Sequence, residues 1–544
     1  MALDHDPFEN HHKFQDDVWG QIRLNDLERD AIDTPEFQRL FRTSQLGFVE
    51  LVYHTANHTR GAHSIGACRM TNRLINRLVD NTKDLHCKYH DEPGCKGLYA
   101  DFEISPVERI LIRLGALLHD ISHVPLSHDL EKKTHKVFYP SQDRPLKVRS
   151  WYGHYDKHDD YEENPLLYRL LCDYDTSVLA RILHYYSKRF WKLLQEDADK
   201  TKHQHLKEFV ELVRQHQQPD WKPELELLPQ LLFHLLFFEK PDEAEKPPRR
   251  IVTSFDNQNR EAWHLGPKTL TPEAAKQWHD AWYQPFRHDI IGNTLSADLI
   301  DYLTRDPQRL GTQRRVDLHL LSYYALVNKN PQNPRKQFRC AIDLHDHKRG
   351  TTRTFILNDL FRLLDLRQDI HEKAVVHRVV QSANAMLARG LLLLAKVGTP
   401  AQDKRPTLKE IVGLGTGQHH ALQSEDLLFQ RLLAICEGKE ERHFVEARRI
   451  FEKLTERRVY RPLVIIPGDW ASDKLGLPQL PAGNDDFRDF PLRTLATIVD
   501  SAYYSPFLMF ACACVEKYVE GVFDTATELW SYTDKIAALE GSDE

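Results

Sequence analysis

The chain has 544 residues, 41% of them hydrophobic and 28% charged, and this composition excludes a disordered chain. A formal net charge of −7 argues against a general nucleic-acid coat, although local basic patches leave nucleic-acid binding open. The eight cysteines are scattered and no signal peptide is evident, which predicts a reduced, cytoplasmic protein. The apolar runs are too short to span a bilayer, so we expect no membrane association.

Two strong helices are predicted in the first third of the chain. The first covers residues 63–80. The second begins at Ser105, an N-cap whose partner Glu108 completes a capping box, and we expect Pro125 to end it. Apolar residues recur along this second helix with a helical period.

The rest of the chain is also predicted to be mainly helical. Further helices are expected at residues 295–306, 369–396 and 425–437, and short strands at 336–346, 352–357 and 461–467. Residues 186–285 are rich in charge, His, Trp and Pro, and we interpret them as a helical insertion. The fold class is therefore mainly α, a helical bundle with a few short strands and helical insertions.

One cysteine-rich stretch could be read in two ways. Cys87, His90 and Cys95 could form a zinc site, but no second paired element follows at zinc-finger spacing. We favour a polar loop.

The dipeptide His119–Asp120 ends an apolar helix, where a carboxylate needs a partner. Adjacent helical residues point about 100° apart, so both side chains can reach one ion. Imidazole and carboxylate together suit a divalent metal, but two ligands are too few. His63 and Asp298, on other predicted helices, are the candidates to complete the set.

Six segments together resemble the HD-domain deoxynucleoside triphosphate triphosphohydrolases, a family with bacterial dGTPase-like and SAM-and-HD-domain members. The segments are AIDTPEFQRLFRTSQLG, HTRGAHSIGA, LLHDISHVPLSHDLE, SADLIDYLTRD, LRQDIHEKAVVHRVV and ERRVYRPL. The resemblance covers roughly residues 14–170 and 285–463. It implies an HD-domain helical bundle whose core is divided between residues 1–185 and 286–465. The second part would include a regulatory and oligomerisation region, 186–285 the insertion, and 466–544 a C-terminal helical segment.

The resemblance also implies a catalytic centre. His63, His119, Asp120 and Asp298 would hold a divalent metal ion, whether Mg, Mn, Fe or Zn. His123 would face phosphate or support the metal ligands. The general acid would be His158 beside Asp159, with His154 as a competing choice.

The resemblance to the family also implies which residues of this chain contact the substrate. Arg60 could equally be a surface charge, and Tyr302 with Asp306 an ordinary buried hydrogen-bonded pair. Two residues depart from the family pattern here, with Leu299 in place of a phosphate-facing Lys and Val375 in place of a Tyr near the base. The expected substrate-binding residues are Arg60, Gln45, Leu46, His128, Tyr302, Asp306, Arg367 and His371.

A second set of residues resembles the family's nucleotide-regulation site between subunits. It predicts a homo-oligomer, a tetramer or hexamer, with a nucleotide activator, and it leaves room for a regulatory protein partner. Phe41 replaces an Arg that would contact guanine, so we expect an activator other than GTP. The set comprises Asp33, Gln38, Arg339, His377, Arg378, Arg457 and Arg461.

The resulting hypothesis is a metal-dependent dNTP triphosphohydrolase that releases deoxynucleoside and inorganic triphosphate. Its purpose would be dNTP depletion in antiviral or antiphage defence, or balance of the nucleotide pool. One alternative is an HD phosphodiesterase or nuclease acting on other nucleotides or on nucleic-acid ends. Another is a nucleotide-sensing protein with little catalysis.

Overall fold

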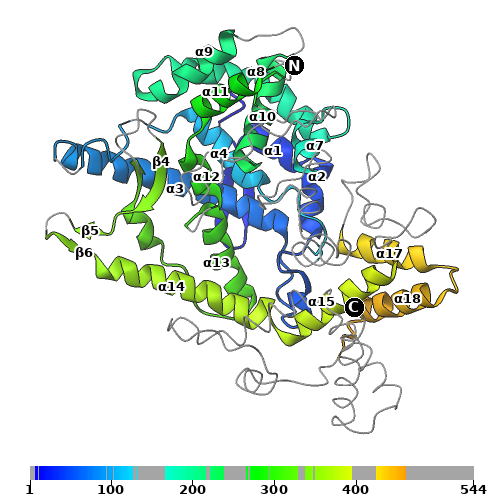
Figure 1. Cartoon of the computed structure of the whole chain (residues 1–544). Helices are drawn as coiled ribbons and strands as arrows, with labels where there is room; N and C mark the ends of the chain where they lie inside the picture. Colours follow the sequence, from blue (N-terminus) through cyan, green and yellow to red (C-terminus); the bar gives the residue numbers. More distant parts are fainter. Residues whose placement is uncertain are drawn as a thin grey trace, which may run out of the picture.

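The structure is a computed structural model and is mainly helical (Figure 1). It describes residues 6–9, 11–92, 95–101, 103–126, 130, 166–215, 221–237, 265–267, 270–292, 295–328, 337–346, 349–394 and 424–460. The mainly α fold expected from the sequence is confirmed. Among the described residues, the strands form three two-stranded antiparallel sheets.

The chain begins with a β-hairpin followed by short helical turns. Strands β1 (His12–Asp16) and β2 (Gly20–Leu24) pair with Asp16 opposite Gly20, and Gly20 adopts a positive φ of 69° at the turn. Helices α1 (Asp26–Ile32) and α2 (Pro35–Gln38) follow, then the 3₁₀ turns η1 (Arg39–Arg42) and η2 (Gly47–Leu51).

Two helices at the centre of the molecule contain parts of the first two His motifs, HTRGAHSIGA and LLHDISHVPLSHDLE. Helix α3 (Arg60–Tyr89) starts after the N-cap Thr59, and α4 (Pro106–Leu118) starts after Ser105 with the expected capping box to Glu108. The two helices pack on each other. Helix α4 ends at Leu118 rather than continuing to Pro125, so His119 is its C-cap and Asp120 lies in the following turn.

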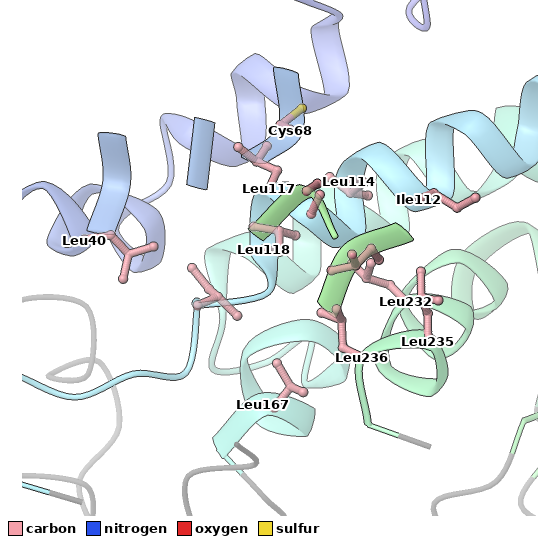
Figure 2. Close-up of a cluster of buried hydrophobic side chains, with 14 of the residues drawn as sticks. Leu40, Cys68, Ile112, Leu114, Leu117, Leu118, Leu167, Leu232, Leu235 and Leu236 are labelled. Carbon is pink, nitrogen blue, oxygen red and sulfur yellow. The ribbon is translucent and has the colours of Figure 1, made fainter. Parts of the chain in front are cut away.

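A second group of helices covers α4 and buries most of its remaining surface. Helices α8 and α10 pack on each other and on α4, and α12 packs on α4 and α3. Leucines from α4, α7 and α10 meet in this core (Figure 2). The bounds are α7 (Leu166–Cys172), α8 (Val178–Ala198), η3 (Thr201–Leu206), α9 (Lys207–Gln215), α10 (Pro223–Phe237), α11 (Pro272–Trp282) and α12 (Pro285–Gly292).

Helix α13 (Ala297–Arg309) lies against α3 and brings the third motif beside the other two. It begins after the N-cap Ser296. The 3₁₀ turn η4 (Leu318–Tyr323) leads into strands β3 (Tyr324–Asn328) and β4 (Phe338–Ile342), and β3 also packs on α3. A small hairpin of β5 (His345–Asp346) and β6 (Thr351–Thr352) follows.

The strand predicted at residues 352–357 is wrong, because helix α14 (Thr354–Ile370) begins there. Its buried residues Ile356, Leu363, Leu366 and Ile370 recur with a helical period and face the rest of the fold. The single helix predicted at 369–396 is broken into a π-helical turn, η5 (His371–Val375), and α15 (Arg378–Leu394).

Three helices form a unit near the end of the described chain, which we call the C-terminal helical unit. Helix α18 (Arg442–Thr455) packs on both α15 and α17 (Glu425–Cys436), as Figure 1 shows in yellow. Helix α15 also contacts η2, so this unit touches the segment that follows η1. The strand predicted at 461–467 and the segment 466–544 lie outside the described residues.

None of the described helices is both long enough and apolar enough to cross a membrane. Helix α8 runs through the boundary expected between residues 185 and 186. One helix therefore spans the expected boundary between core and insertion, and α10, within the expected insertion, packs directly on α4.

Candidate metal centre

Three helices bring His63, His119 and Asp298 together. His63 lies in the first turn of α3, His119 caps the C-terminus of α4, and Asp298 lies in the first turn of α13. One ligand atom from each lies within 4.8 Å of the others. His63 Nε2 is 3.3 Å from His119 Nε2 and 3.1 Å from Asp298 Oδ1, and His119 Nε2 is 3.6 Å from Asp298 Oδ1.

The hydrogen bonds at the far side of each imidazole fix its tautomer. His119 Nδ1 lies 2.8 Å from the Ala116 carbonyl oxygen, which can only accept, so Nδ1 carries the proton. His63 Nδ1 donates in the same way to Asp301 Oδ2 at 2.8 Å. In the neutral imidazoles, both Nε2 lone pairs therefore point at Asp298 and are available to a metal.

These donors fit a divalent metal ion. Ligands about 2.0–2.2 Å from one ion lie roughly 3.0–3.5 Å from one another, which is close to the three separations observed. Two imidazole nitrogens and a carboxylate suit Zn, Fe or Mn better than they suit calcium. The side chain of His63 is 1% exposed and that of Asp298 32%, so the cluster meets solvent on the Asp298 side.

The charges of the cluster are mutually dependent. Burial alone would lower the pKa of His63, but hydrogen bonds to Asp298 and Asp301 raise that pKa to about 10. Burial would raise the pKa of Asp298, but His119 and His63 hold it below its ordinary value. Metal ligation by an imidazole requires its neutral form, so metal binding at this site should release protons.

Asp120, the fourth expected ligand, lies beside the other three. Its Oδ1 is 3.4 Å from His119 Nε2, and its Oδ2 is 3.9 Å from His63 Nε2. Arg60, buried in the first turn of α3, forms a short ion pair with Asp120 Oδ2. Burial would raise the pKa of Asp120, but Arg60 and the neighbouring imidazoles hold it well below its ordinary value.

His123 lies against the same carboxylate, with its Nε2 3.3 Å from Asp120 Oδ1. Arg39, a buried residue in η1, donates to the backbone carbonyls of Ile121 and His123 and so holds this turn in place. Sequence reasoning missed Arg39. The FQRL motif could have indicated Arg39, because an Arg next to apolar residues is buried only when it has a partner.

Asp301 was also missed, although it lies only one helical turn beyond Asp298. It is completely buried and accepts from His63, from Arg305 and from the indole N–H of Trp19. Such a carboxylate fixes the ring orientation of a metal-binding His. The spacing of Asp298 and Asp301 on one helix was the available signal.

Two of the residues expected near the sugar, Gln45 and Asp306, are linked to each other through His58. Gln45 N donates to the His58 carbonyl at 3.0 Å, and His58 Nε2 lies 2.8 Å from Asp306 Oδ1. The buried Gln45 Oε1 has no hydrogen-bond partner among the described residues. Leu46, half-buried, follows Gln45 directly and precedes η2.

The two residues expected near phosphate on α13 and α14 are neighbours. Tyr302 is half-buried, and the Arg367 guanidinium acts electrostatically on its hydroxyl, although burial dominates and raises the pKa of Tyr302. His371 is exposed at the start of the π-helical turn, and Val375 ends that turn. Leu299, in place of the family's Lys, is buried against the core.

The residues expected at a regulatory site are dispersed over the molecule. Asp33 and Gln38 are both exposed, and Gln38 donates to the Ile32 carbonyl at 2.8 Å. Arg339 on β4 forms a bidentate ion pair with buried Asp289, at 2.7 and 2.9 Å, and so contributes to the fold.

The basic residues near the C-terminal helical unit differ in their contacts. His377 Nδ1 accepts from Val379 N, which caps α15, and Arg378 beside it is exposed. Arg457 has a φ of 60° and donates to the Glu50 carbonyl at 2.8 Å, which ties the end of α18 to η2.

Five expected residues lie outside the described part of the chain: His128, His154, His158, Asp159 and Arg461. Among the residues that the structure does describe, His63, His119 and Asp298 are the one group of three or more side chains positioned to hold a metal. Among the described residues, Cys87, His90 and Cys95 do not form such a group. The polar-loop interpretation is only partly right, because Cys87 lies in helix α3 and His90 is its C-cap.

Two buried histidines and a half-buried aspartate meet where three helices come together, with the HD dipeptide at the end of one, and this matches the order of ligands expected from the sequence. Comparison with curated proteins supports the HD-domain class. An HD domain-containing protein of Acanthamoeba polyphaga mimivirus is 38% identical over 111 residues, which is 20% of this chain and 23% of that protein.

Two further relatives are named as deoxynucleoside triphosphate triphosphohydrolases. The SAMHD1 homologue of Dictyostelium discoideum is 27% identical over 157 residues, 28% of this chain and 27% of that protein. SAMHD1 of Danio rerio is 32% identical over 115 residues, 21% of this chain and 16% of that protein. No protein-family model matches the chain. The chain thus matches about a quarter or less of the length of these relatives, and the matches support an HD-domain hydrolase.

Proposed function

We propose that this protein is a metal-dependent dNTP triphosphohydrolase. The observation that carries the proposal is the convergence of His63, His119 and Asp298, with both imidazole Nε2 atoms directed at one carboxylate. The names of the SAMHD1 relatives supply the substrate class. Both Nε2 atoms face the same carboxylate, an arrangement that needs a cation between them, either a proton or a metal ion.

In the proposed reaction, water attacks the α-phosphorus and the bond to the 5′-oxygen breaks. A divalent ion held by His63, His119 and Asp298, with Asp120 beside them, would supply Lewis acidity toward the α-phosphate. Arg60 offers a planar cation to the phosphate oxygens, and the Asp120 carboxylate fixes its position. His123 adds a polar group on the same side of the cluster.

The leaving 5′-oxygen needs a proton to depart as a hydroxyl. His158 with Asp159 is the general acid that we propose from the sequence, and His154 is its competitor. The product pair is a deoxynucleoside and inorganic triphosphate. Water thereby supplies the oxygen gained by phosphorus, and its two protons are divided between the leaving group and solvent.

On the sugar side, Gln45, Leu46 and Asp306 would form the surface that meets deoxyribose. The Gln45 amide oxygen is buried without a partner among the described residues, and Asp306 is held by His58. A pocket that desolvates a 2′-hydroxyl without pairing it costs about 1–3 kcal/mol, so ribonucleotides should react at least several-fold more slowly.

Analysis of the reaction products tests this proposal. The 544-residue chain is incubated with each of the four dNTPs and four NTPs, alone and in pairs, with Mg²⁺ or Mn²⁺. We expect deoxynucleoside and triphosphate in equal amounts and faster turnover of dNTPs than of NTPs. Release of monophosphate and pyrophosphate, or cleavage of cyclic nucleotides or nucleic-acid ends instead, would assign the protein to the HD phosphodiesterases.

Leu299 is the observation that favours an HD phosphodiesterase. The residue after Asp298 on α13 is a buried aliphatic side chain, so this position offers no cation to a triphosphate. Nucleotide binding without turnover would indicate a sensor. If triphosphate is the product, a role in antiviral or antiphage defence is our proposal for its purpose, with balance of the dNTP pool as the competing one.

A further inference from the structure

A chain of hydrogen bonds leads from His63 to the N-terminal β-hairpin. His63 Nδ1 donates to Asp301 Oδ2, and Asp301 Oδ1 accepts from the indole N–H of Trp19. Asp301 is fully buried, so its orientation depends on these partners and not on solvent. Trp19 lies in the turn between β1 and β2, far in sequence from the helices that hold the metal ligands.

Arg305 supports the same carboxylate from one turn further along α13. Its Nε is 3.0 Å from Asp301 Oδ2 and its Nη2 is 3.1 Å from Asp301 Oδ1. Its Nη1 is 3.1 Å from Asp16 and 3.1 Å from Asp17, both in the hairpin turn. The turn therefore contacts the Asp301–Arg305 pair through two carboxylates and one indole.

The sequence of the turn fixes where the indole points. Asp16 Oδ1 accepts from Val18 N at 2.9 Å and from Trp19 N at 2.7 Å, which closes the turn around its own side chain. Gly20 completes the turn with a positive φ of 69°. Trp19 thus reaches Asp301 from a backbone that is itself hydrogen-bonded.

The opposite side of Asp301 is closed by helix α3. A Cβ atom at Gly66 would lie 1.9 Å from Asp301 Oδ1 and 2.5 Å from Arg305 Nη2. Only glycine allows α3 to approach so closely, and His63 lies one turn earlier on this same helix. Asp301 is therefore held between α3 and the hairpin turn, with His63 and Trp19 on its two oxygens.

We propose that Trp19 is a positioning residue for the metal centre: by fixing Asp301, the N-terminal hairpin sets the orientation of the His63 ring toward the metal. The proposal rests on the metal centre of the proposed function and not on the identity of the substrate. A carboxylate that is rotated away from His63 Nδ1 would leave the imidazole free to turn, and the loss of such a partner typically lowers metal affinity about 10–100-fold.

The test compares metal binding in two Trp→Phe variants of the 544-residue chain. Trp19→Phe keeps an aromatic ring and removes the N–H donor. The control, Trp221→Phe, removes an indole N–H that donates to Gln230 Oε1 at 3.3 Å, away from the metal centre. Apparent dissociation constants for Mn²⁺ and Co²⁺ are measured by competition with a chelator, and the visible spectrum of the Co²⁺ form reports the ligand geometry.

We expect Trp19→Phe to weaken metal binding about tenfold and to alter the Co²⁺ spectrum, while Trp221→Phe changes neither. Asp301→Asn, which removes the charge that His63 contacts, should weaken binding at least as much. Metal affinity within twofold of the unaltered protein and an unchanged Co²⁺ spectrum in Trp19→Phe would overturn the proposal.

A measurement on the unaltered protein tests the same link between Trp19 and the metal centre even if a variant fails to fold. With ¹⁵N-tryptophan labelling, the Trp19 indole resonance should shift when Zn²⁺ is added, and the Trp221 indole resonance should not. A Trp19 resonance that ignores bound Zn²⁺ would contradict the proposed link. If the unaltered protein binds none of these metals, the metal centre itself is wrong. If it binds metal but releases no triphosphate, only the proposed reaction fails.

Discussion

At the scale of single residues, each imidazole in the metal centre is aimed by a hydrogen bond at its far nitrogen. His119 uses a backbone carbonyl of its own helix, which any helical sequence provides. His63 uses the carboxylate of Asp301, which a different helix must bring to it. The second arrangement depends on tertiary structure, and it is therefore the more easily disturbed of the two.

Asp298 is the residue on which the metal assignment depends most. Its Oδ1 is the atom that both Nε2 nitrogens approach, at 3.1 and 3.6 Å. Asp298→Ala should therefore lower metal affinity by more than the ~10–100-fold typical of losing a supporting partner, and should abolish turnover. Metal stoichiometry by elemental analysis and activity at saturating metal are the measurements. Asp91→Ala, at an exposed loop position, is the control and should change neither.

The sequence predicted that His63, His119 and Asp298 belong together, but not the groups that orient them. His63, His119 and Asp298 could be named because their residue types and order match a known pattern. Trp19 and Arg39 could not, because a tryptophan or arginine acquires such a role only through the partner that folding places opposite it. His58 was within a quoted motif, yet its contact with Asp306 crosses from the start of α3 to α13.

At the scale of secondary-structure elements, local signals predicted helix starts better than helix ends. The capping box at Ser105 and Glu108 is present as expected. The end of α4 was placed too late, because Pro125 marks the last residue that could stop a helix and not the first that does. The strand expected at 352–357 was a short apolar run, which periodicity alone does not distinguish from a helix.

One contact couples the C-terminal helical unit to the candidate site. Glu425, the first residue of α17, accepts with Oε1 from Ser44 N at 3.0 Å and from Leu126 N at 3.4 Å. Ser44 precedes the expected sugar residue Gln45, and Leu126 follows the turn that carries His123. Burial raises the pKa of Glu425 to about 7, despite the two N–H donors, and Glu50 and Asp426 add to the effect.

This raised pKa predicts a pH-dependent stability. A folded-state pKa above the ordinary value of 4.5 means that folding favours the protonated acid. The stabilisation is complete below about pH 4.5 and is lost as the pH rises through about 7. The side chain of Glu425→Gln does not titrate. The Tm of this variant minus the Tm of the unaltered protein should therefore be several degrees higher at pH 8 than at pH 5.5. Thermal unfolding at both pH values measures this difference.

Glu440→Gln provides the matched control, because Glu440 is exposed in the loop before α18. Its Tm difference should be the same at pH 5.5 and at pH 8. An equal Tm difference at the two pH values for Glu425→Gln would show that Glu425 is not held in a protonated, buried state.

At the scale of the whole molecule, the candidate site lies where segments from distant parts of the sequence meet. The N-terminal hairpin contacts α13 through Arg305, and the C-terminal helical unit contacts the Gln45 segment through Glu425 and Arg457. Sequence motifs indicated which segments belong together. They could not indicate these contacts, because the pairs are separated by about 280 to 400 residues.

Contacts within the chain also reduce the number of residues that could bind a regulatory nucleotide. Arg339 is held by Asp289, and Arg457 by the Glu50 carbonyl, so both already have partners within the chain. Arg378 is exposed at the start of α15 and makes no ion pair with another described residue. Among the expected regulatory arginines that the structure describes, Arg378 is therefore the best placed to meet a nucleotide phosphate.

We predict that a second, non-substrate nucleotide stabilises the assembled protein through Arg378. A ligand that binds only the assembled form shifts its stability by mass action, by about 2.7 kcal/mol at a hundredfold excess over Kd. Light scattering and the rate of dNTP hydrolysis should therefore both rise when dTTP is added to another dNTP. Arg378→Glu should weaken both responses at least tenfold, because it places a negative charge against the phosphates. Arg431→Glu, at an exposed position on α17, is the control for the change in net charge.

Metal content should be normal in both variants, since neither residue contacts the His63 cluster. A protein that remains monomeric and hydrolyses every dNTP at a rate unaffected by added nucleotides would exclude this regulation, and a full response in Arg378→Glu would exclude Arg378 as its site.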